Sequence, residues 1–149
     1  MRKEETVDYA IKATWHAIAR MYHQQAAKQS ITMSMGYVLL NIPSEEGMPA
    51  TKIAPLMGLE ARSLSRLLKS MEERGLICRE ADRKDKRMVR VVLTREGRKK
   101  KEKSRETVLR FNVAVRNHIE ARRLDGFFKV LCDIQQIVEQ DKIYQQATT

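Results

Sequence analysis

The sequence predicts a mainly α-helical fold that carries one small β-hairpin wing. Two apolar, β-branched runs flank the short hydrophilic segment 82–87, which is typical of a hairpin. Directly before them, residues 58–75 supply a turn and then an amphipathic helix that ends at a glycine. Elsewhere, apolar residues recur at helical spacing over most of the chain. A helix, a turn, a basic helix and a charged hairpin in this order predict a winged helix-turn-helix with further helices at both ends.

Length and charge narrow the possible partners. A chain of 149 residues suits one ordinary domain, so we expect a single domain over 1–149. The formal net charge of +10 favours a polyanion, either nucleic acid or an anionic membrane surface. The N-terminus has no apolar signal-peptide core, and no stretch approaches the roughly 20 apolar residues of a membrane span. We therefore expect a cytoplasmic protein with nucleic acid, not a membrane, as partner.

The first helix is expected over 4–29, where apolar residues recur every three or four positions. These residues are Val7, Ile11, Trp15, Ile18 and Tyr22. A second helix is expected from Met33, after polar capping residues, and Pro43 and Gly47 end it.

A short third helix is expected over 52–57, with Thr51 as its N-cap. Pro55 lacks a backbone N–H, which predicts a tight or late start for this helix.

The fourth helix has two opposite faces. Its apolar residues follow the i, i+3, i+4, i+7 rule, and they are Leu64, Leu67, Leu68 and Met71. Its polar and cationic residues repeat that spacing two residues earlier, and they are Arg62, Ser65, Arg66 and Lys69. Two residues correspond to about 200° of rotation, so the second set lies opposite the first. Gly75 suits the end of this helix.

The remaining segments predict the wing strands and two long helices. Residues 77–81 lead into the charged tip, and 88–94 lead out of it. A fifth helix begins near Thr94 and carries the cationic run 98–101, which either touches phosphate or is simply exposed. The last helix has apolar residues from Leu124 to Val138, and residues 145–149 are expected to fray.

Metal sites, cofactors and catalytic groups are not predicted. Cys78 and Cys132 have no CxxC or histidine partner at metal spacing, which predicts two reduced thiols. His16 and His23 are seven residues apart, a spacing that does not chelate one metal without further ligands. The sequence has no nucleophile with a spaced base and no glycine-rich phosphate loop, so we expect no enzyme.

Several fragments, in this order and spacing, resemble the MarR family of transcription regulators. They are Ile53-Ala54, Gly58-Leu59, residues 63–67, residues 72–77, the tip 82–87 and residues 93–97. The resemblance implies a homodimer held by helices at 4–29 and 98–140, with a winged lobe at 33–97 that reads a pseudopalindromic operator on double-stranded DNA. The apolar stripes of the terminal helices are too long to bury within one small subunit, so we expect Phe127, Phe128 and Leu131 at the subunit interface. The resemblance also implies a repressor released by a small aromatic or phenolic ligand, or by oxidation of a cysteine.

The sequence departs from the family pattern at two places. Glu60 stands where a small hydroxyl residue is usual, so its carboxylate is expected to cap the fourth helix. Peroxide-sensing members carry a reactive cysteine near the start of the chain, where this sequence has none. A redox switch is therefore not implied by position.

The expected DNA contacts lie on the fourth helix and the wing. They are Arg62, Ser63, Ser65, Arg66, Lys69, Arg83, Lys84, Asp85 and Arg87. The resemblance implies that Asp85 orients the Arg87 guanidinium in a minor groove. The alternatives are a merely solvated helix face and an ordinary charged turn.

The expected effector pocket lies where the terminal helices meet the winged lobe, as the resemblance implies. Its residues are Trp15, Ile18, Arg20, Tyr22, Met33 and Tyr37. Aromatic walls, flexible methionine and a nearby cation suit a small aromatic carboxylate. The alternative is that these side chains only fill the junction. A winged-helix scaffold for protein interactions, without an effector, is the alternative function, although the basic fourth helix favours DNA.

Overall fold

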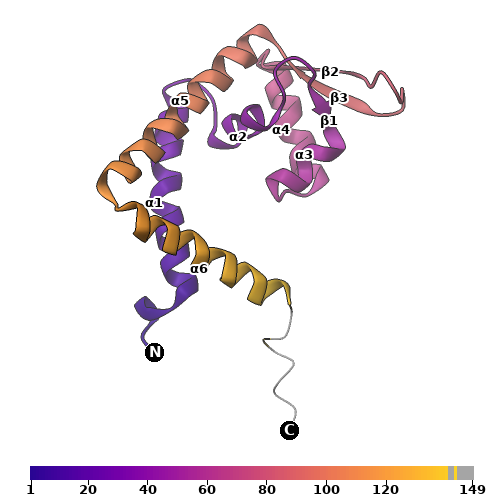
Figure 1. The fold of residues 1–149 in the computed structure, drawn as a ribbon. Coiled ribbons are helices and arrows are strands. Elements are labelled where there is room, and N and C mark those ends of the chain that lie inside the picture. Colours follow the sequence, from indigo (N-terminus) through magenta and orange to yellow (C-terminus); the bar gives the residue numbers. More distant parts are fainter. Residues whose placement is uncertain (141–142, 144–149) are drawn as a thin grey trace. The chain divides into compact units, whose positions relative to one another are not determined.

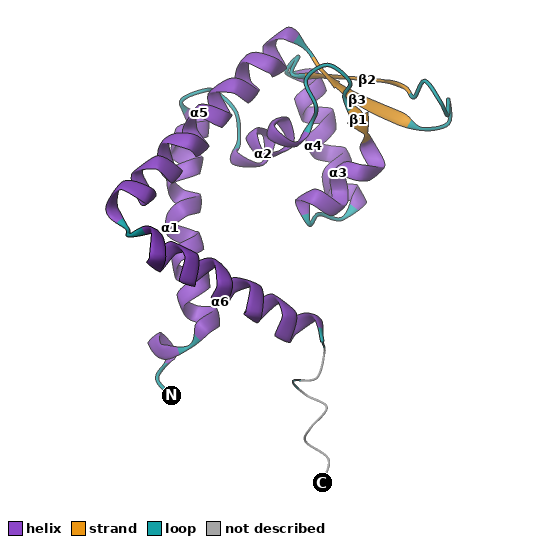
Figure 2. Ribbon diagram, viewed as in Figure 1, coloured by secondary structure: helices purple, strands orange, loops and turns teal. Residues whose placement is uncertain are grey.

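The computed structural model describes residues 1–140 and Ile143, so the expected fraying of 145–149 lies outside the described residues. Figures 1 and 2 show helices in most of this part and one small sheet. The elements are a 3-10 turn at Lys3–Glu5, α1 Val7–Ala27, α2 Met33–Asn41, β1 Met48–Pro49, α3 Ala50–Met57, α4 Ala61–Glu73, β2 Ile77–Ala81, β3 Val89–Leu93, α5 Arg95–His118 and α6 Ala121–Glu139. The chain divides into two compact units, Met1–Val108 and Leu109–Thr149, and each is described by itself.

The predicted mainly helical fold with a hairpin wing is confirmed. Strands β2 and β3 pair antiparallel, with Ile77 opposite Leu93 and Ala81 opposite Val89. A third strand, β1, pairs with the other edge of β3, which gives the order β1-β3-β2. The sequence did not predict β1 because two residues, one of them proline, cannot produce an alternating pattern.

The core of the first unit joins α2, α3 and α4 to the sheet. Its fully buried side chains are Val38, Leu39, Ile42, Ile53, Met71, Ile77 and Val91. Leu64 and Leu68 are 4% exposed and belong to the same cluster, so the apolar face predicted for α4 is the buried one. Burial of an aliphatic side chain contributes about 1.5 to 3 kcal/mol, so this cluster fixes α4 on the sheet.

Two helix starts differ from the prediction. Helix α1 begins at Val7 because residues 3–5 form a 3-10 turn, which the Arg2–Glu5 ion pair at 2.8 Å holds. Helix α3 begins at Ala50, and Thr51 lies inside it, so Thr51 is not the N-cap. Pro49 takes the N-cap position because it ends β1 immediately before the helix. The late start predicted from Pro55 is therefore wrong, and Pro55 lies within the helix.

The turn between α1 and α2 is tight. Ser30 has φ of 58°, a left-handed conformation that is uncommon outside glycine. Helix α2 then begins at Met33 as predicted, because the Thr32 hydroxyl accepts the Met35 N–H at 3.1 Å.

The cationic run at the start of α5 holds loops of the first unit. Lys100 Nζ donates to the Gln29 carbonyl at 2.8 Å, and Lys101 Nζ donates to the Ile42 carbonyl at 2.5 Å. Arg98 Nε donates to the Ser44 carbonyl at 3.2 Å. These carbonyls follow the ends of α1 and α2, where backbone acceptors lack partners within the helix. Three of the four cations at 98–101 therefore donate to backbone carbonyls of the same chain. The sequence had predicted either phosphate contact or simple exposure for this run, and neither includes such contacts.

Replacing Lys101 by methionine is expected to destabilise the protein by about 1 to 3 kcal/mol, because the part-buried Ile42 carbonyl loses a charged donor. Urea unfolding followed by circular dichroism measures this loss. Lys99→Met is the matched control, since Lys99 is exposed and its ammonium lies 3.9 Å from Glu96. Equal effects at both positions would contradict the structural role of Lys101.

The second unit contains the end of α5 and all of α6. Helix α6 buries Leu124 but leaves Phe127 51% and Phe128 48% exposed. The two phenylalanine rings lie 5.5 Å apart in a tilted arrangement. Among the described residues, none of the helices combines the length and apolar character needed to cross a membrane.

Candidate nucleic-acid interface

The predicted DNA-contacting residues of α4 share one exposed surface. Arg62, Ser63, Ser65, Arg66 and Lys69 are all exposed, whereas Leu64 and Leu68 are buried. The turn before α4 depends on Gly58, whose φ of 60° favours glycine. Helices α3 and α4 thus form a helix-turn-helix in which α4 presents three cations and two hydroxyls to solvent.

Glu60 occupies the N-cap position of α4, but its side chain makes no capping hydrogen bond. The predicted carboxylate cap is therefore wrong. Glutamate is one methylene longer than the residues that cap well, and its carboxylate does not reach back to the first amides. Its negative charge still lies beside the helix N-terminus, where the helix dipole favours it.

Asp82 organises the tip of the wing. The residue is only 7% exposed, and its carboxylate accepts the backbone N–H groups of Lys84 at 2.8 Å and Asp85 at 3.2 Å. The same carboxylate accepts Arg90 Nε at 2.9 Å. These hydrogen bonds, the backbone ones foremost, hold the pKa of Asp82 below its usual range. The carboxylate is therefore charged at neutral pH and fixes the turn.

Asp85 has a backbone partner within the tip of the wing. Its carboxylate accepts the backbone N–H of Arg87 at 3.0 Å, and within the described residues it makes no ion pair with the Arg87 guanidinium. An aspartate two residues before an amide readily accepts that N–H in a local turn. This contact of Asp85 competes with a contact to the Arg87 guanidinium. Arg83, Lys84 and Arg87 are all exposed at the tip.

Two further arginines position the wing, and the sequence pattern indicated neither. Arg90 links Asp82 to the loop before β1, because its Nη1 donates to the Glu46 carbonyl at 2.8 Å. Arg79 on β2 pairs with Glu72 near the end of α4, at 2.6 Å between Nη2 and Oε2. The sequence does contain a local signal for the Asp82 turn, because this carboxylate stands two and three residues before the amides that it accepts. It contains no such signal for the Arg90 contact, because Glu46 is 44 residues away from Arg90.

A family model described as the MarR family matches residues 31–89, the segment that carries α2, the helix-turn-helix, β2 and the tip of the wing. The transcriptional regulator TtmR of Methylorubrum extorquens is 36% identical over 90 residues, which are 60% of this chain and 46% of TtmR. The chain thus spans less than half of that relative's length. Residues 31–89 of the chain are thus similar to the MarR family. The relatives that these comparisons name are transcription regulators.

A second relative comes from Bacillus subtilis. Its organic hydroperoxide resistance transcriptional regulator is 29% identical over 104 residues, which are 70% of this chain and 71% of the relative. Neither cysteine of this chain, Cys78 or Cys132, forms a disulfide, and both are exposed.

Solved MarR regulators share this fold. CouR from Rhodococcus jostii RHA1, bound to p-coumaroyl-CoA, has a TM-score of 0.79 and 19% identity, and the match covers 90% of this chain and 94% of CouR. The S. aureus MepR–DNA complex has a TM-score of 0.79 and 20% identity, with 88% and 97% covered. At such identities the likeness establishes the winged-helix fold.

The six residues expected to form the effector pocket vary in exposure. Trp15 is 52% and Tyr37 51% exposed, and Arg20 is also exposed, whereas Ile18 and Met33 are partly buried. Burial raises the pKa of the partly buried Tyr22. A hollow of about 330 Å³ lies elsewhere in the first unit, and none of these six residues lines it.

Within the described residues, histidine, cysteine and carboxylate side chains form no cluster of three or more suited to a metal.

Proposed function

We propose that this protein is a homodimeric, sequence-specific double-stranded DNA-binding transcription regulator that acts as a repressor. The observation that carries the proposal is the exposed surface of α4, which sets Arg62, Arg66 and Lys69 opposite a buried apolar face. A cationic helix of this kind fits a phosphate-lined major groove. The exposed tip cations of the wing then extend the contact to a neighbouring minor groove.

Exposed apolar side chains support the dimer. Helix α1 exposes Val7, Ile11 and Trp15 by 43% to 56%, and α6 exposes Phe127, Phe128, Val130, Ile137 and Val138 by 48% to 61%. Such surfaces on a water-soluble chain mark interaction sites. We therefore assign the two-fold interface to the terminal helices 4–29 and 98–140, with the winged lobe at 33–97.

A selection of genomic DNA fragments with purified protein tests the proposed function. We expect enriched fragments to contain two inverted half-sites about 10 bp apart, because a two-fold dimer places two α4 helices in successive major grooves. In fluorescence anisotropy, a duplex with both half-sites should bind much more tightly than one with a single half-site. Equal affinity for the two duplexes, or a monomer mass by light scattering at micromolar concentration, would overturn the dimeric model.

We also propose that a small aromatic carboxylate binds near Trp15, Ile18, Arg20, Tyr22, Met33 and Tyr37 and releases DNA. Support comes from the exposed aromatic rings of Trp15 and Tyr37 and from CouR, a regulator of the same fold with an aromatic acyl-CoA bound. The ligand can weaken DNA binding only if it prefers one conformation of the dimer.

Trp15 is the only tryptophan, so its fluorescence reports ligand binding directly. Titration with benzoate- and salicylate-like compounds should change this fluorescence and release the selected DNA with matching midpoints. An aromatic panel that changes neither signal up to millimolar concentration would end the effector proposal and leave the DNA-binding one intact.

A further inference from the structure

Asp82 divides its two carboxylate oxygens between different partners in the wing. Oδ1 accepts the backbone N–H groups of Lys84 and Asp85, which closes the turn at the tip. Oδ2 accepts Arg90 Nε on β3 at 2.9 Å. Because the two oxygens have separate partners, the turn at the tip does not depend on Arg90. A substitution of Arg90 therefore removes the contacts of its guanidinium without opening the turn.

Strand β1 pairs only with the inner part of the wing. It has two residues, and its last one, Pro49, pairs with Arg90. Val89 and the tip 82–88 lie beyond this pair, and Figure 1 shows β2 and β3 running on past β1. Proline has no N–H, so Pro49 donates no backbone hydrogen bond to β3. Since a two-stranded hairpin is only marginally stable by itself, the outer wing needs a further contact to fix its direction.

Arg90 makes such a contact at the point where pairing with β1 ends. Its Nη1 donates to the Glu46 carbonyl at 2.8 Å, in the loop 42–47 that precedes β1. The Arg90 side chain is 24% exposed and the Asp82 side chain 8%, so water and salt screen this ion pair less than a fully exposed one. One guanidinium thus joins the tip of the wing, through Asp82, to the loop, through the Glu46 carbonyl.

The loop 42–47 is itself fixed within the first unit. Arg98 Nε of α5 donates to the Ser44 carbonyl at 3.2 Å. Gly47 has φ of 63°, and a Cβ atom there would collide with the Val91 carbonyl oxygen, so the loop lies against β3. The wing is therefore held to a fixed part of the fold rather than to a free loop.

The direction of the wing matters because the tip is far from its base. Arg90 is five residues from Asp85 at the tip, which is about 16 Å at roughly 3.3 Å per residue. A swing of about 20° would move the tip by about 6 Å, roughly the full width of a minor groove. The cations at the tip, Arg83, Lys84 and Arg87, are exposed, so such a swing changes the base pairs that they reach.

We propose that Arg90 is a positioning residue for DNA recognition, which selects the base pairs outside the half-sites that the wing reads. It acts without touching DNA, because it sets the direction of the wing through Asp82 and the Glu46 carbonyl. This role rests on the DNA-binding function proposed above. The half-sites are read by α4, a different element, so a mutation can separate the two preferences.

Residual dipolar couplings of backbone amides test the Arg90 contacts on the protein alone, without DNA. In the parent, the couplings of residues 82–88 should fit the same orientation as those of α4. In Arg90→Met, the wing couplings should shrink because the wing samples several directions. The α4 couplings should stay unchanged, which also shows that the variant folds. Wing couplings that keep their parental values in Arg90→Met would overturn the proposal.

Fluorescence anisotropy tests recognition with duplexes that share both half-sites and differ only in A·T-rich or G·C-rich flanks. The parent should prefer A·T-rich flanks, because a narrow minor groove attracts the tip cations. Arg90→Met should bind the A·T-rich duplex about three- to tenfold more weakly, the value of about one hydrogen bond, and should bind both duplexes alike. It should keep the parental preference for two half-sites over one. Arg2→Met removes an exposed charge outside the winged lobe and should change neither preference.

Arg90→Lys separates positioning from a direct contact between the charge and phosphate. Lysine keeps the charge, but one ammonium replaces the planar guanidinium that reaches Asp82 and the Glu46 carbonyl together, so this variant should bind like Arg90→Met. Full recovery of the flank preference by lysine would assign a direct charge contact and overturn the positioning role. A parent that binds the operator without a flank preference would also overturn it and leave recognition by α4 intact. A parent that binds no duplex would contradict the proposed function itself, and with it this role.

Discussion

Replacing Arg62 or Arg66 by alanine is expected to weaken operator binding by about 1 to 3 kcal/mol each, which is roughly a 5- to 150-fold loss of affinity. Both side chains are exposed on α4, on the opposite side from Leu64 and Leu68, so their removal should leave the fold intact. Fluorescence anisotropy with the selected operator measures the loss, and circular dichroism checks the fold. Arg2→Ala removes an exposed arginine outside both the winged lobe and the proposed dimer helices, and it should leave the affinity unchanged.

Salt dependence separates base contacts from phosphate contacts. For the parent dimer, the logarithm of affinity should fall with the logarithm of salt concentration with a slope of order −5 or steeper, because several phosphates are neutralised. A variant that loses a phosphate contact should reduce this slope by about one, whereas a variant that loses a base contact should relax sequence preference. A flat salt response of the parent protein would contradict binding through the α4 surface.

The sequence predicts α4 well because burial and charge both follow the helical repeat within thirteen residues. The whole signal is local, so no partner elsewhere in the chain has to be known. The same is true of α2, whose start is fixed by Thr32 three residues before the amide that it caps.

The sequence predicts poorly those features that depend on distant partners. Arg98, Lys100 and Lys101 look like an exposed charge run, yet their acceptors lie 54 to 71 residues away. Strand β1 exists only because β3 offers an edge to Met48 and Pro49. Arg90 becomes a wing-positioning residue only when the fold brings the Glu46 carbonyl beside it. The sequence therefore predicts the main helices better than it predicts the contacts that long side chains make with partners distant in the chain.

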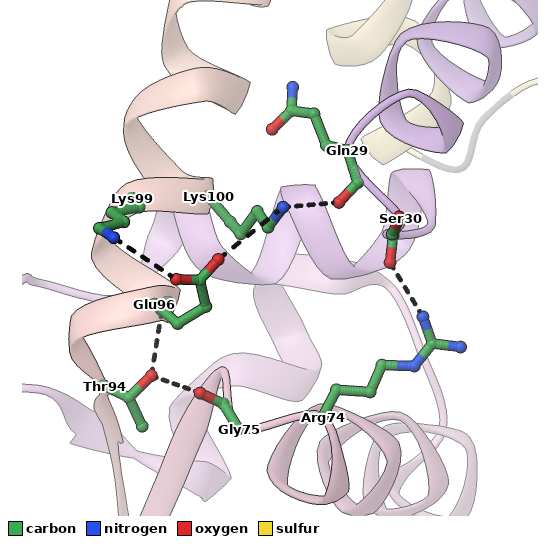
Figure 3. A network of polar contacts seen from close by, with 9 residues as sticks. Gln29, Ser30, Arg74, Gly75, Thr94, Glu96, Lys99 and Lys100 are labelled. Carbon is green, nitrogen blue, oxygen red and sulfur yellow. Dashed lines mark hydrogen bonds and ion pairs between the residues drawn. The ribbon is translucent and has the colours of Figure 1, made fainter.

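Gly97 in the first turn of α5 illustrates a constraint that only the structure explains. Its N–H donates to the Thr94 hydroxyl at 3.0 Å, and that hydroxyl donates to the Gly75 carbonyl at 2.6 Å (Figure 3 labels both partners). Thr94 N–H also donates to the Leu76 carbonyl at 3.1 Å. These contacts draw α5 against the turn after α4, and a Cβ atom on Gly97 would collide with the Leu76 carbonyl oxygen.

Gly97→Ala is therefore expected to destabilise the protein by about 2 to 4 kcal/mol, because relief of the collision must move backbone rather than a flexible side chain. Gly126→Ala is the matched control. Gly126 lies inside α6, and a Cβ atom added there would meet no atom of its own protomer within 4 Å, so alanine should stabilise the helix by about 0.5 to 1 kcal/mol. Urea unfolding of both variants at one protein concentration measures the difference. Two small changes of the same sign would mean that α5 is not fixed to the Leu76 carbonyl through this close approach.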